Sequence, residues 1–188
     1  MKGNGDNNLM YGKGGGDIMR GYGDKDFLNG GNGSDKLYPG KGFHNRALGG
    51  PGADTLYGGI GYDSLNGGLG ADKLYGGTKA DGLTTGVGSR NPYRTDPPPA
   101  ALDSSDDVAY GGRDNDAFFT TWSRAGVDLL YGEGGNDYFG VNQSDIGPGP
   151  VTKEIVDCGP GPYDEVVYDE GVDVVKNCEW LRTGYPDT

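Results

Sequence analysis

Residues 49–75 have the sequence GGPGADTLYGGIGYDSLNGGLGADKLY, which is three consecutive copies of a nine-residue unit, Gly-Gly-x-x-x-Asp-x-Leu-x. Two further intact copies are GGNGSDKLY, from Gly30, and GGTKADGLT, from Gly76. The glycines permit a tight turn with positive φ. Each unit therefore predicts a turn that carries one carboxylate and is followed by a short strand with one inward apolar side chain.

A single apolar residue per unit cannot form a core, but stacked units can superimpose their leucines, as in solenoid proteins. The pattern therefore predicts an all-β repeat fold with a ladder of leucines inside. The inward residues of the intact units are Leu37, Leu56, Leu65, Leu74 and Leu83.

The unit resembles the RTX, or hemolysin-type, calcium-binding nonapeptide repeat, which forms a parallel β-helix or β-roll. The resemblance implies that two units make one full coil, so that units two apart stack and share Ca²⁺ between their turns. The carboxylates are then expected to stack at eighteen-residue intervals, and Asp54 with Asp72 and Asp63 with Asp81 have this spacing. The expected metal-ligating residues are Asp17, Asp26, Asp35, Asp54, Asp63, Asp72, Asp81, Asp107, Asp116, Asp128 and Asp137, with Gly33, Gly52, Gly61 and Gly70.

One extra residue interrupts the register between Pro39 and Leu48. The ligand position that faces Asp26 and Asp63 then falls on His44 or Asn45, so we expect a calcium site on that edge to be lost or weakened. Upstream, three weaker units can be read in two frames. One frame points Met10, Met19 and Leu28 inward, and the other points Leu9, Ile18 and Phe27 inward.

The pattern breaks after Leu83 and Thr84, where a Pro-rich stretch without apolar periodicity predicts a surface loop. It resumes with Asp107 and Asp116, and then with Asp128 and Asp137. Asp128 follows Asp107 by twenty-one residues, and Asp137 follows Asp116 by the same number, so the aspartates on both edges of the roll are shifted equally. A three-residue bulge in TTWSRA, residues 120–125, would preserve the stacking. We therefore expect a calcium-binding β-roll at 1–84, a Pro-rich surface loop at 85–105, degenerate repeats that continue the roll at 106–140, and a C-terminal cap at 141–188.

In the last segment alternating valines replace most glycine turns, which is typical of a divergent β cap that closes a solenoid. Cys158 and Cys178 lie in it and bracket one last unit-like piece, GPGPYDEVV, residues 159–167. One disulfide closing a loop of about 20 residues would contribute roughly 3 kcal/mol, and two buried free thiols are the alternative. A disulfide persists only in oxidising surroundings.

The chain has 16 basic and 28 acidic residues, a net charge of −12, and this acidic balance argues against a nucleic-acid partner. Two carboxylates about 4 Å apart repel by about 4 kcal/mol at an effective dielectric near 20. Several such pairs would exceed the roughly 5 to 15 kcal/mol of net stability of a domain. We therefore expect the chain to require several Ca²⁺ ions in order to fold.

Catalysis has little support, because His44 is the single histidine and no catalytic motif is present. No signal-peptide apolar region and no membrane span are evident. Tyr38, Tyr57 and Tyr75 are expected to form an outward row, either as ordinary strand residues or as a strip for sugar or another subunit.

The first hypothesis is a non-enzymatic, calcium-folded structural module that is secreted or lies on the cell surface. The alternatives are an adhesive or carbohydrate-binding module, and the repeat region of a larger secreted enzyme or toxin. The repeats begin near Met1 without an N-terminal cap. From this we expect a fragment, a processed chain, or an open end that meets a second copy in a homo-oligomer or filament.

Overall fold

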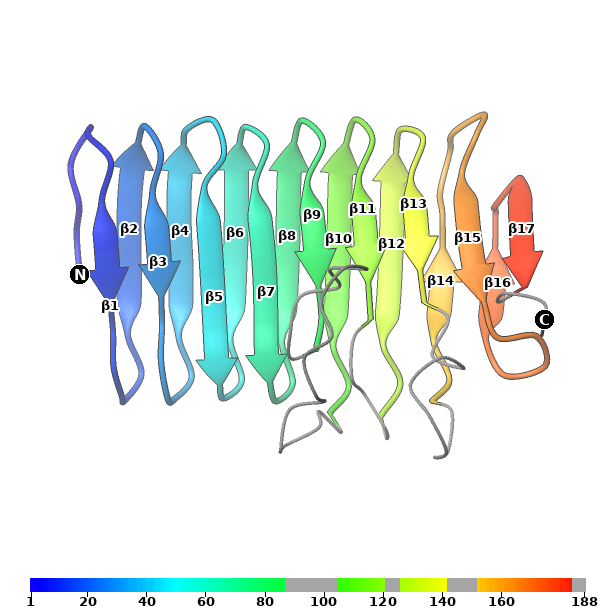
Figure 1. Cartoon of the computed structure of the whole chain (residues 1–188), viewed down its shortest axis with the longest axis horizontal. Helices are drawn as coiled ribbons and strands as arrows, with labels where there is room; N and C mark the ends of the chain where they lie inside the picture. The colour runs from blue at the N-terminus through cyan, green and yellow to red at the C-terminus, as the bar shows by residue number, and fades with distance from the viewer. Residues whose placement is uncertain (87–104, 121–125, 142–151, 184–188) are drawn as a thin grey trace, which may run out of the picture.

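The computed structural model describes residues 1–86, 105–120, 126–141 and 152–183, and every helix or strand within these ranges is a β-strand. Successive strands alternate between two facing sheets, so that each coil contributes one strand to each sheet (Figure 1). The odd-numbered strands are β1 (Leu9–Tyr11), β3 (Phe27–Asn29), β5 (Arg46–Pro51), β7 (Ser64–Leu69), β9 (Gly82–Thr84), β11 (Ala117–Phe119), β13 (Tyr138–Gly140), β15 (Glu165–Tyr168) and β17 (Trp180–Thr183). The even-numbered strands are β2 (Ile18–Gly23), β4 (Lys36–Lys41), β6 (Thr55–Ile60), β8 (Lys73–Thr78), β10 (Val108–Arg113), β12 (Leu129–Gly134), β14 (Ile155–Asp157) and β16 (Val174–Lys176).

Within each sheet the strands pair in parallel and follow one another in chain order. The register places equivalent repeat positions side by side, as where Leu56 of β6 lies beside Leu74 of β8. The same alignment continues from Ala109 of β10 to Leu130 of β12, twenty-one residues later. The predicted parallel β-roll is therefore confirmed.

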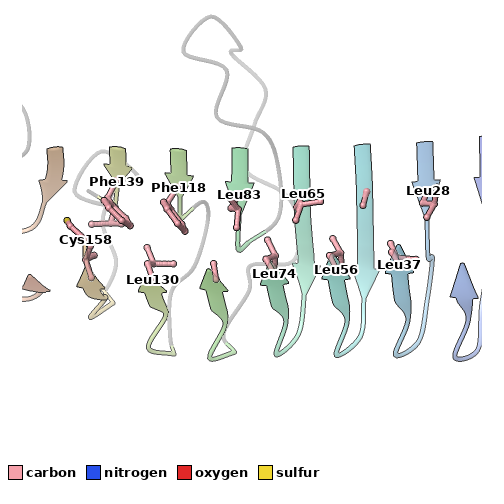
Figure 2. Close-up of a cluster of buried hydrophobic side chains, with 14 of the residues drawn as sticks. Leu28, Leu37, Leu56, Leu65, Leu74, Leu83, Phe118, Leu130, Phe139 and Cys158 are labelled. Carbon is pink, nitrogen blue, oxygen red and sulfur yellow. The ribbon is translucent and has the colours of Figure 1, made fainter. Parts of the chain in front are cut away.

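The core is a double column of apolar side chains, one from each of the strands β1 to β15, that fills the narrow space between the sheets (Figure 2). Alternate residues of a strand point to opposite faces, so only the second residue of each three-residue strand core points inward. The buried column consists of Met10, Met19, Leu28, Leu37, Ala47, Leu56, Leu65, Leu74, Leu83, Ala109, Phe118, Leu130, Phe139, Val156 and Val166, with Val141 and Cys158 beside it.

The structure decides between the two N-terminal frames. Met19 and Leu28 are fully buried, whereas Leu9 and Ile18 are 67% and 49% exposed. The frame with Met10, Met19 and Leu28 inward is therefore confirmed, and the frame that points Leu9 and Ile18 inward is wrong.

The coil of β10 and β11 has inward residues of very different size. Ala109 on β10 is small, and Phe118 on β11 is large. Phe118 stacks on Phe139 of the next coil, with ring centroids 4.5 Å apart. Both rings are fully buried, so this pair forms an aromatic section of the core column.

The outer face of the even-numbered sheet carries a row of stacked tyrosines that is longer than the predicted one. Consecutive ring centroids lie 4.9, 4.8, 5.2 and 5.0 Å apart, with interplanar angles of 4° to 11°. The guanidinium of Arg20 lies 4.9 Å from the ring centroid at the N-terminal end of the row. The row consists of Tyr38, Tyr57, Tyr75, Tyr110 and Tyr131, and we call it the tyrosine row.

The described part of segment 141–188 continues both sheets. β14 and β16 extend the even-numbered sheet, and β15 and β17 extend the odd-numbered one. On β17, Trp180 and Leu181 are 56% and 54% exposed. The role of this segment as a closing cap stays a prediction. The predicted loop at 85–105 lies outside the described residues except for Thr85, Gly86 and Ser105, and the predicted bulge lies outside them except for Thr120.

Candidate metal centre

Each turn ends in an acidic or amide residue directly before the next strand. In the central coils this residue stands two positions before the inward leucine, as Asp54 stands before Leu56. Residues two apart on an extended chain face the same side, so the carboxylate also points into the solenoid, beneath the turn. This explains why Asp54 and Asp72 are each only 1% exposed, although both lie at a turn.

These side chains form two continuous rows, one along each edge of the roll. We call the residues directly before the even-numbered strands the even row, and those directly before the odd-numbered strands the odd row. In each row a side-chain oxygen accepts a hydrogen bond from the backbone N–H of the equivalent residue one coil earlier, at 2.6 to 3.1 Å. In the even row such hydrogen bonds join Asp17, Asp35, Asp54, Asp72, Asp107 and Asp128 in that order, and one more joins Glu154 to Asp173. Those of the odd row join Asn8, Asp26, Asn45, Asp63, Asp81, Asp116, Asp137, Asp164 and Glu179.

The second carboxylate oxygen, Oδ2, is buried in most of these residues and accepts no hydrogen bond. A buried acceptor without a partner costs about 1 to 3 kcal/mol, and more when it is charged. This condition holds for Asp17, Asp26, Asp35, Asp54, Asp63, Asp81, Asp116, Asp137 and Asp164. Asp128 differs, because its Oδ2 accepts a 2.9 Å hydrogen bond from the Thr85 hydroxyl.

Backbone carbonyls crowd the same turns. Gly52 has φ +149°, and a Cβ built on it would overlap the carbonyl oxygen of Gly33 in the preceding turn. Gly70 has the same relation to Gly52, and Gly61 has it to Gly42. Glycine is therefore required there both by its backbone conformation and by the close approach of the neighbouring turn. The predicted residues Gly33, Gly52, Gly61 and Gly70 thus lie where backbone oxygens meet the turn of the next coil.

Burial raises the pKa of several carboxyl groups, with examples in each row. Loss of solvation is the main cause, and it raises the pKa of Asp54 and Asp63 to about 6, of Asp116 to about 7 and of Asp81 to about 8. Neighbouring carboxylates add to the effect, as where Asp116 and Asp63 raise the pKa of Asp81. The rows therefore disfavour their own negative charge unless a cation accompanies it.

The arrangement fits Ca²⁺, which takes six to eight oxygen ligands from carboxylates and carbonyls. Among the described residues, no group of three or more His, Cys, Asp or Glu side chains is close enough to hold a metal ion. Side-chain oxygens alone thus do not provide a cage. Carboxylates such as Asp54 and Asp63 would bind a cation together with carbonyl oxygens of adjacent turns, and the binding role of each predicted residue stays a prediction.

The position opposite Asp26 and Asp63 is occupied by Asn45. Asn45 is 1% exposed and accepts the Asp26 N–H at 2.8 Å, whereas His44 lies on the exposed turn with φ +65°. Because Asn8 precedes Asp26 in the odd row, Asp26 has an amide on both sides. The odd row is thus poorest in charge near its N-terminal end.

Five members of the two rows were not predicted from the sequence. They hold the same place as the repeat aspartates, but their turns lack the Gly-Gly opening. The sequence signal that could have found them is an acidic or amide residue two positions before an inward apolar residue. Asp164 has this relation to Val166, and Asn8 has it to Met10. The five are Asn8, Glu154, Asp164, Asp173 and Glu179.

The stacked coils, the two carboxylate rows and the glycine turns define the class of the protein. It is a parallel β-solenoid whose turns have the oxygen ligands of a calcium-binding repeat. Sequence comparison agrees, since the profile of the RTX calcium-binding nonapeptide repeat matches four times, at residues 2–42, 48–83, 103–121 and 122–140. The matches cover more than half of the chain, which therefore belongs to the RTX calcium-binding nonapeptide repeat family. A search of curated proteins gave no match. No helix in the described ranges is long and apolar enough to cross a membrane.

Proposed function

We propose that this chain is a structural module that folds upon binding several Ca²⁺ ions and works outside the cell. The observation that carries the proposal is the burial, in both rows, of carboxylates such as those of Asp54, Asp63 and Asp81, whose Oδ2 atoms lack hydrogen-bond partners. A cation between successive turns would satisfy these atoms and neutralise their charge. The free energy of binding would then be free energy of folding, since no such site exists in the unfolded chain.

Calcium supply and redox chemistry both favour an extracellular setting. Extracellular calcium modules commonly bind at about 10⁻⁴ to 10⁻³ M, so such a chain would remain loose in a calcium-poor cytosol. Cys158 and Cys178 form a disulfide, and disulfides persist in oxidising compartments. Two independent features thus support secretion or cell-surface display.

A structural role is favoured over catalysis. The repeat roll is a structural repeat rather than a catalytic fold, and His44 lies on an exposed turn beside Phe43 and Tyr62, with ring centroids 6.5 and 5.6 Å away. The His44 ring stacks on Tyr62, which is a contact that a structural residue makes. The module could equally serve as the repeat region of a larger secreted enzyme or toxin, in which case the chemistry would belong to another part of that protein.

The tyrosine row favours a structural role over a sugar platform. A sugar ring stacks on the face of an aromatic ring, but in this row each inner ring is covered on both faces, as Tyr57 is by Tyr38 and Tyr75. Arg20 covers one face of Tyr38. The row presents mainly ring edges, so it supports the sheet more directly than it supports a carbohydrate site.

The test is circular dichroism of the purified chain in excess EGTA, after which Ca²⁺ or Mg²⁺ is titrated in. We expect the β-sheet signal to be weak in EGTA, to return with Ca²⁺, and to return far less with Mg²⁺, which demands compact octahedral geometry. A full β-sheet signal at neutral pH in EGTA would overturn the proposal.

A further inference from the structure

The turn between β14 and β15, residues 158–164, departs from every repeat turn. Its sequence is CGPGPYD, and it lies beyond residue 140, where the last match to the repeat family ends. It connects the two sheets at the same edge as the turns that carry the odd row (Figure 1). Its last residue, Asp164, stands directly before β15.

Asp164 nevertheless has the environment of a repeat aspartate. Its Oδ1 accepts the N–H of Asp137 at 2.8 Å, and its own N–H donates to Oε2 of Glu179 at 2.9 Å. The residue is fully buried, and its Oδ2 has no hydrogen-bond partner. The same unsatisfied oxygen that marks the repeat turns is thus present in a turn without the repeat motif.

The carboxylate of Asp164 is held differently from those of the repeats. In the preceding coil the Oδ2 of Asp137 lies against Gly132, which follows Tyr131 on β12. The first residue of the new turn is Cys158, which is fully buried and has a side chain in the corresponding place. The Asp164 carboxylate lies against Gly161 instead, where a Cβ would be 2.7 and 2.9 Å from its two oxygens.

A backbone oxygen meets the carboxylate at this point. A Cβ on Gly161 would also overlap the carbonyl oxygen of Gly135, from the preceding coil. The absence of a side chain at Gly161 therefore leaves a place where the Asp164 carboxylate and the Gly135 carbonyl approach each other. Carboxylate and carbonyl oxygens are the ligands that Ca²⁺ prefers.

The disulfide brackets this place. Cys158 opens the turn that carries Asp164, and Cys178 immediately precedes Glu179. The bond holds the two Cα atoms 5.3 Å apart. It thereby fixes the distance between the turns of two consecutive members of the odd row, at the end of the roll where Glu179 itself is exposed.

We propose that Asp164, Glu179 and the Gly135 carbonyl form a further Ca²⁺ site outside the recognised repeats, and that the Cys158–Cys178 disulfide holds its two turns in position. The inference rests on the proposed calcium binding of the repeats. The competing explanation is a proton on Asp164, which would satisfy Oδ2 without a metal.

Replacing Asp164 by Asn separates the two explanations, because Asn imitates the protonated acid but does not provide a charged ligand. The matched control is Glu170→Gln, which changes the same charge at an exposed residue outside both rows. We would count bound Ca²⁺ by equilibrium dialysis and follow amide hydrogen exchange in β15 and β17, with and without Ca²⁺. We expect Asp164→Asn to lose one bound Ca²⁺ and the Ca²⁺-dependent protection of β15, while β6 and β8 keep theirs.

If Asp164→Asn binds as many Ca²⁺ ions as the wild type and protects β15 equally well, Asp164 carries a proton instead of binding a metal, and the inference is overturned. If Asp164→Asn does not fold, Glu179→Gln makes the same test at an exposed position, with the same expected loss. A wild-type chain that binds no Ca²⁺ at all would instead overturn the proposed function, so the two failures are distinguishable.

The role of the disulfide has its own measurement. In the double variant Cys158→Ser, Cys178→Ser we expect Ca²⁺ affinity at this site to fall by about 10- to 100-fold, the usual effect of removing a group that orients metal ligands. Affinity at the repeat sites should stay the same. If the Asp164 site binds Ca²⁺ with equal affinity in the oxidised chain and in the double variant, the disulfide does not position the ligands of this site.

Discussion

The backbone N–H of Asp35 donates a 2.7 Å hydrogen bond to Oδ1 of Asp54 in the next coil. Asp54 therefore uses its two carboxylate oxygens differently, since Oδ1 joins two coils and Oδ2 has no protein partner. The hydrogen bond needs only an oxygen, whereas a cation site needs charge. This difference allows the two contributions to be measured separately.

Asp54→Asn should retain the hydrogen bond and impair metal binding. We expect the Ca²⁺ concentration at half-folding to rise by about tenfold, which corresponds to roughly 1.4 kcal/mol. Calcium titrations monitored by circular dichroism make the comparison, with the exposed Glu170→Gln as control. A midpoint equal to that of the control would show that Oδ2 of Asp54 does not bind the metal.

The two edges should respond differently to the loss of a carboxylate. Asp72 has carboxylates on both sides in the even row, Asp54 and Asp107, whereas Asp26 has Asn8 and Asn45. Asp72→Ala should therefore raise the calcium midpoint more than Asp26→Ala. The reverse order in parallel titrations would contradict the assignment of the sites.

Asn45→Asp should shift the melting temperature in opposite directions with and without Ca²⁺. The variant places a carboxylate between Asp26 and Asp63, where the wild-type chain has an amide. In saturating Ca²⁺ we expect a higher melting temperature than that of the wild type, and in EGTA a lower one, because the new buried charge lacks a counter-ion. A shift of the same sign in both conditions would refute a metal role for this position.

The metal-free chain should be more stable in acid. Burial raises the pKa of Asp54 and Asp81 in the folded state to about 6 and about 8, above the ordinary value of 3.8. The folded state then binds more protons than the unfolded state, so stability is greatest below about pH 4 and falls as pH rises towards 8. Circular dichroism in EGTA between pH 4 and 8 should show β-structure lost with rising pH, and constant signal across this window would contradict the burial of the rows.

The tyrosine row should contribute to stability without controlling assembly. Tyr57→Ser removes two stacking contacts, each worth about 0.5 to 1.5 kcal/mol beyond area burial. We expect a lower melting temperature and an unchanged mass by light scattering in Ca²⁺. If wild type forms larger assemblies that Tyr57→Ser abolishes, the row is an intermolecular surface instead.

The register of the central coils was predictable because spacing alone encodes it. Asp54 and Asp72 are eighteen residues apart with no interruption, and Asp107 and Asp128 keep the offset of Asp116 and Asp137. The hydrogen bonds Asp54 to Asp72 and Asp107 to Asp128 confirm these pairings. A strict period leaves one stacking arrangement that buries the inward leucine of every central unit.

The remaining row members could not be found by spacing. Asp164 follows Asp137 by twenty-seven residues, and its turn opens with Cys158 instead of the glycine pair. The inserted length hid the period at Asp164. Position relative to the inward residue, as of Asp164 to Val166, is set by strand geometry and survives such insertions. Tyr110 and Tyr131 were missed for another reason, because they stand three residues after the predicted Asp107 and Asp128, as Tyr57 stands after Asp54, and the predicted tyrosine row was not extended to them.

Three odd-numbered strands, β9, β11 and β13, are each followed by nine or more residues before the next even-numbered strand, and their C-terminal ends, at Thr84, Phe119 and Gly140, lie on the same edge of the roll. The opposite edge turns within three or four residues from β2 through β13. Connections from odd-numbered to even-numbered strands therefore vary in length along the roll, whereas those from even-numbered to odd-numbered strands are nearly constant from β2 through β13. Peptides or small domains grafted beside Thr84 should be accommodated without disturbing the Tyr38 to Tyr131 face, which would make this edge a natural attachment point for engineering.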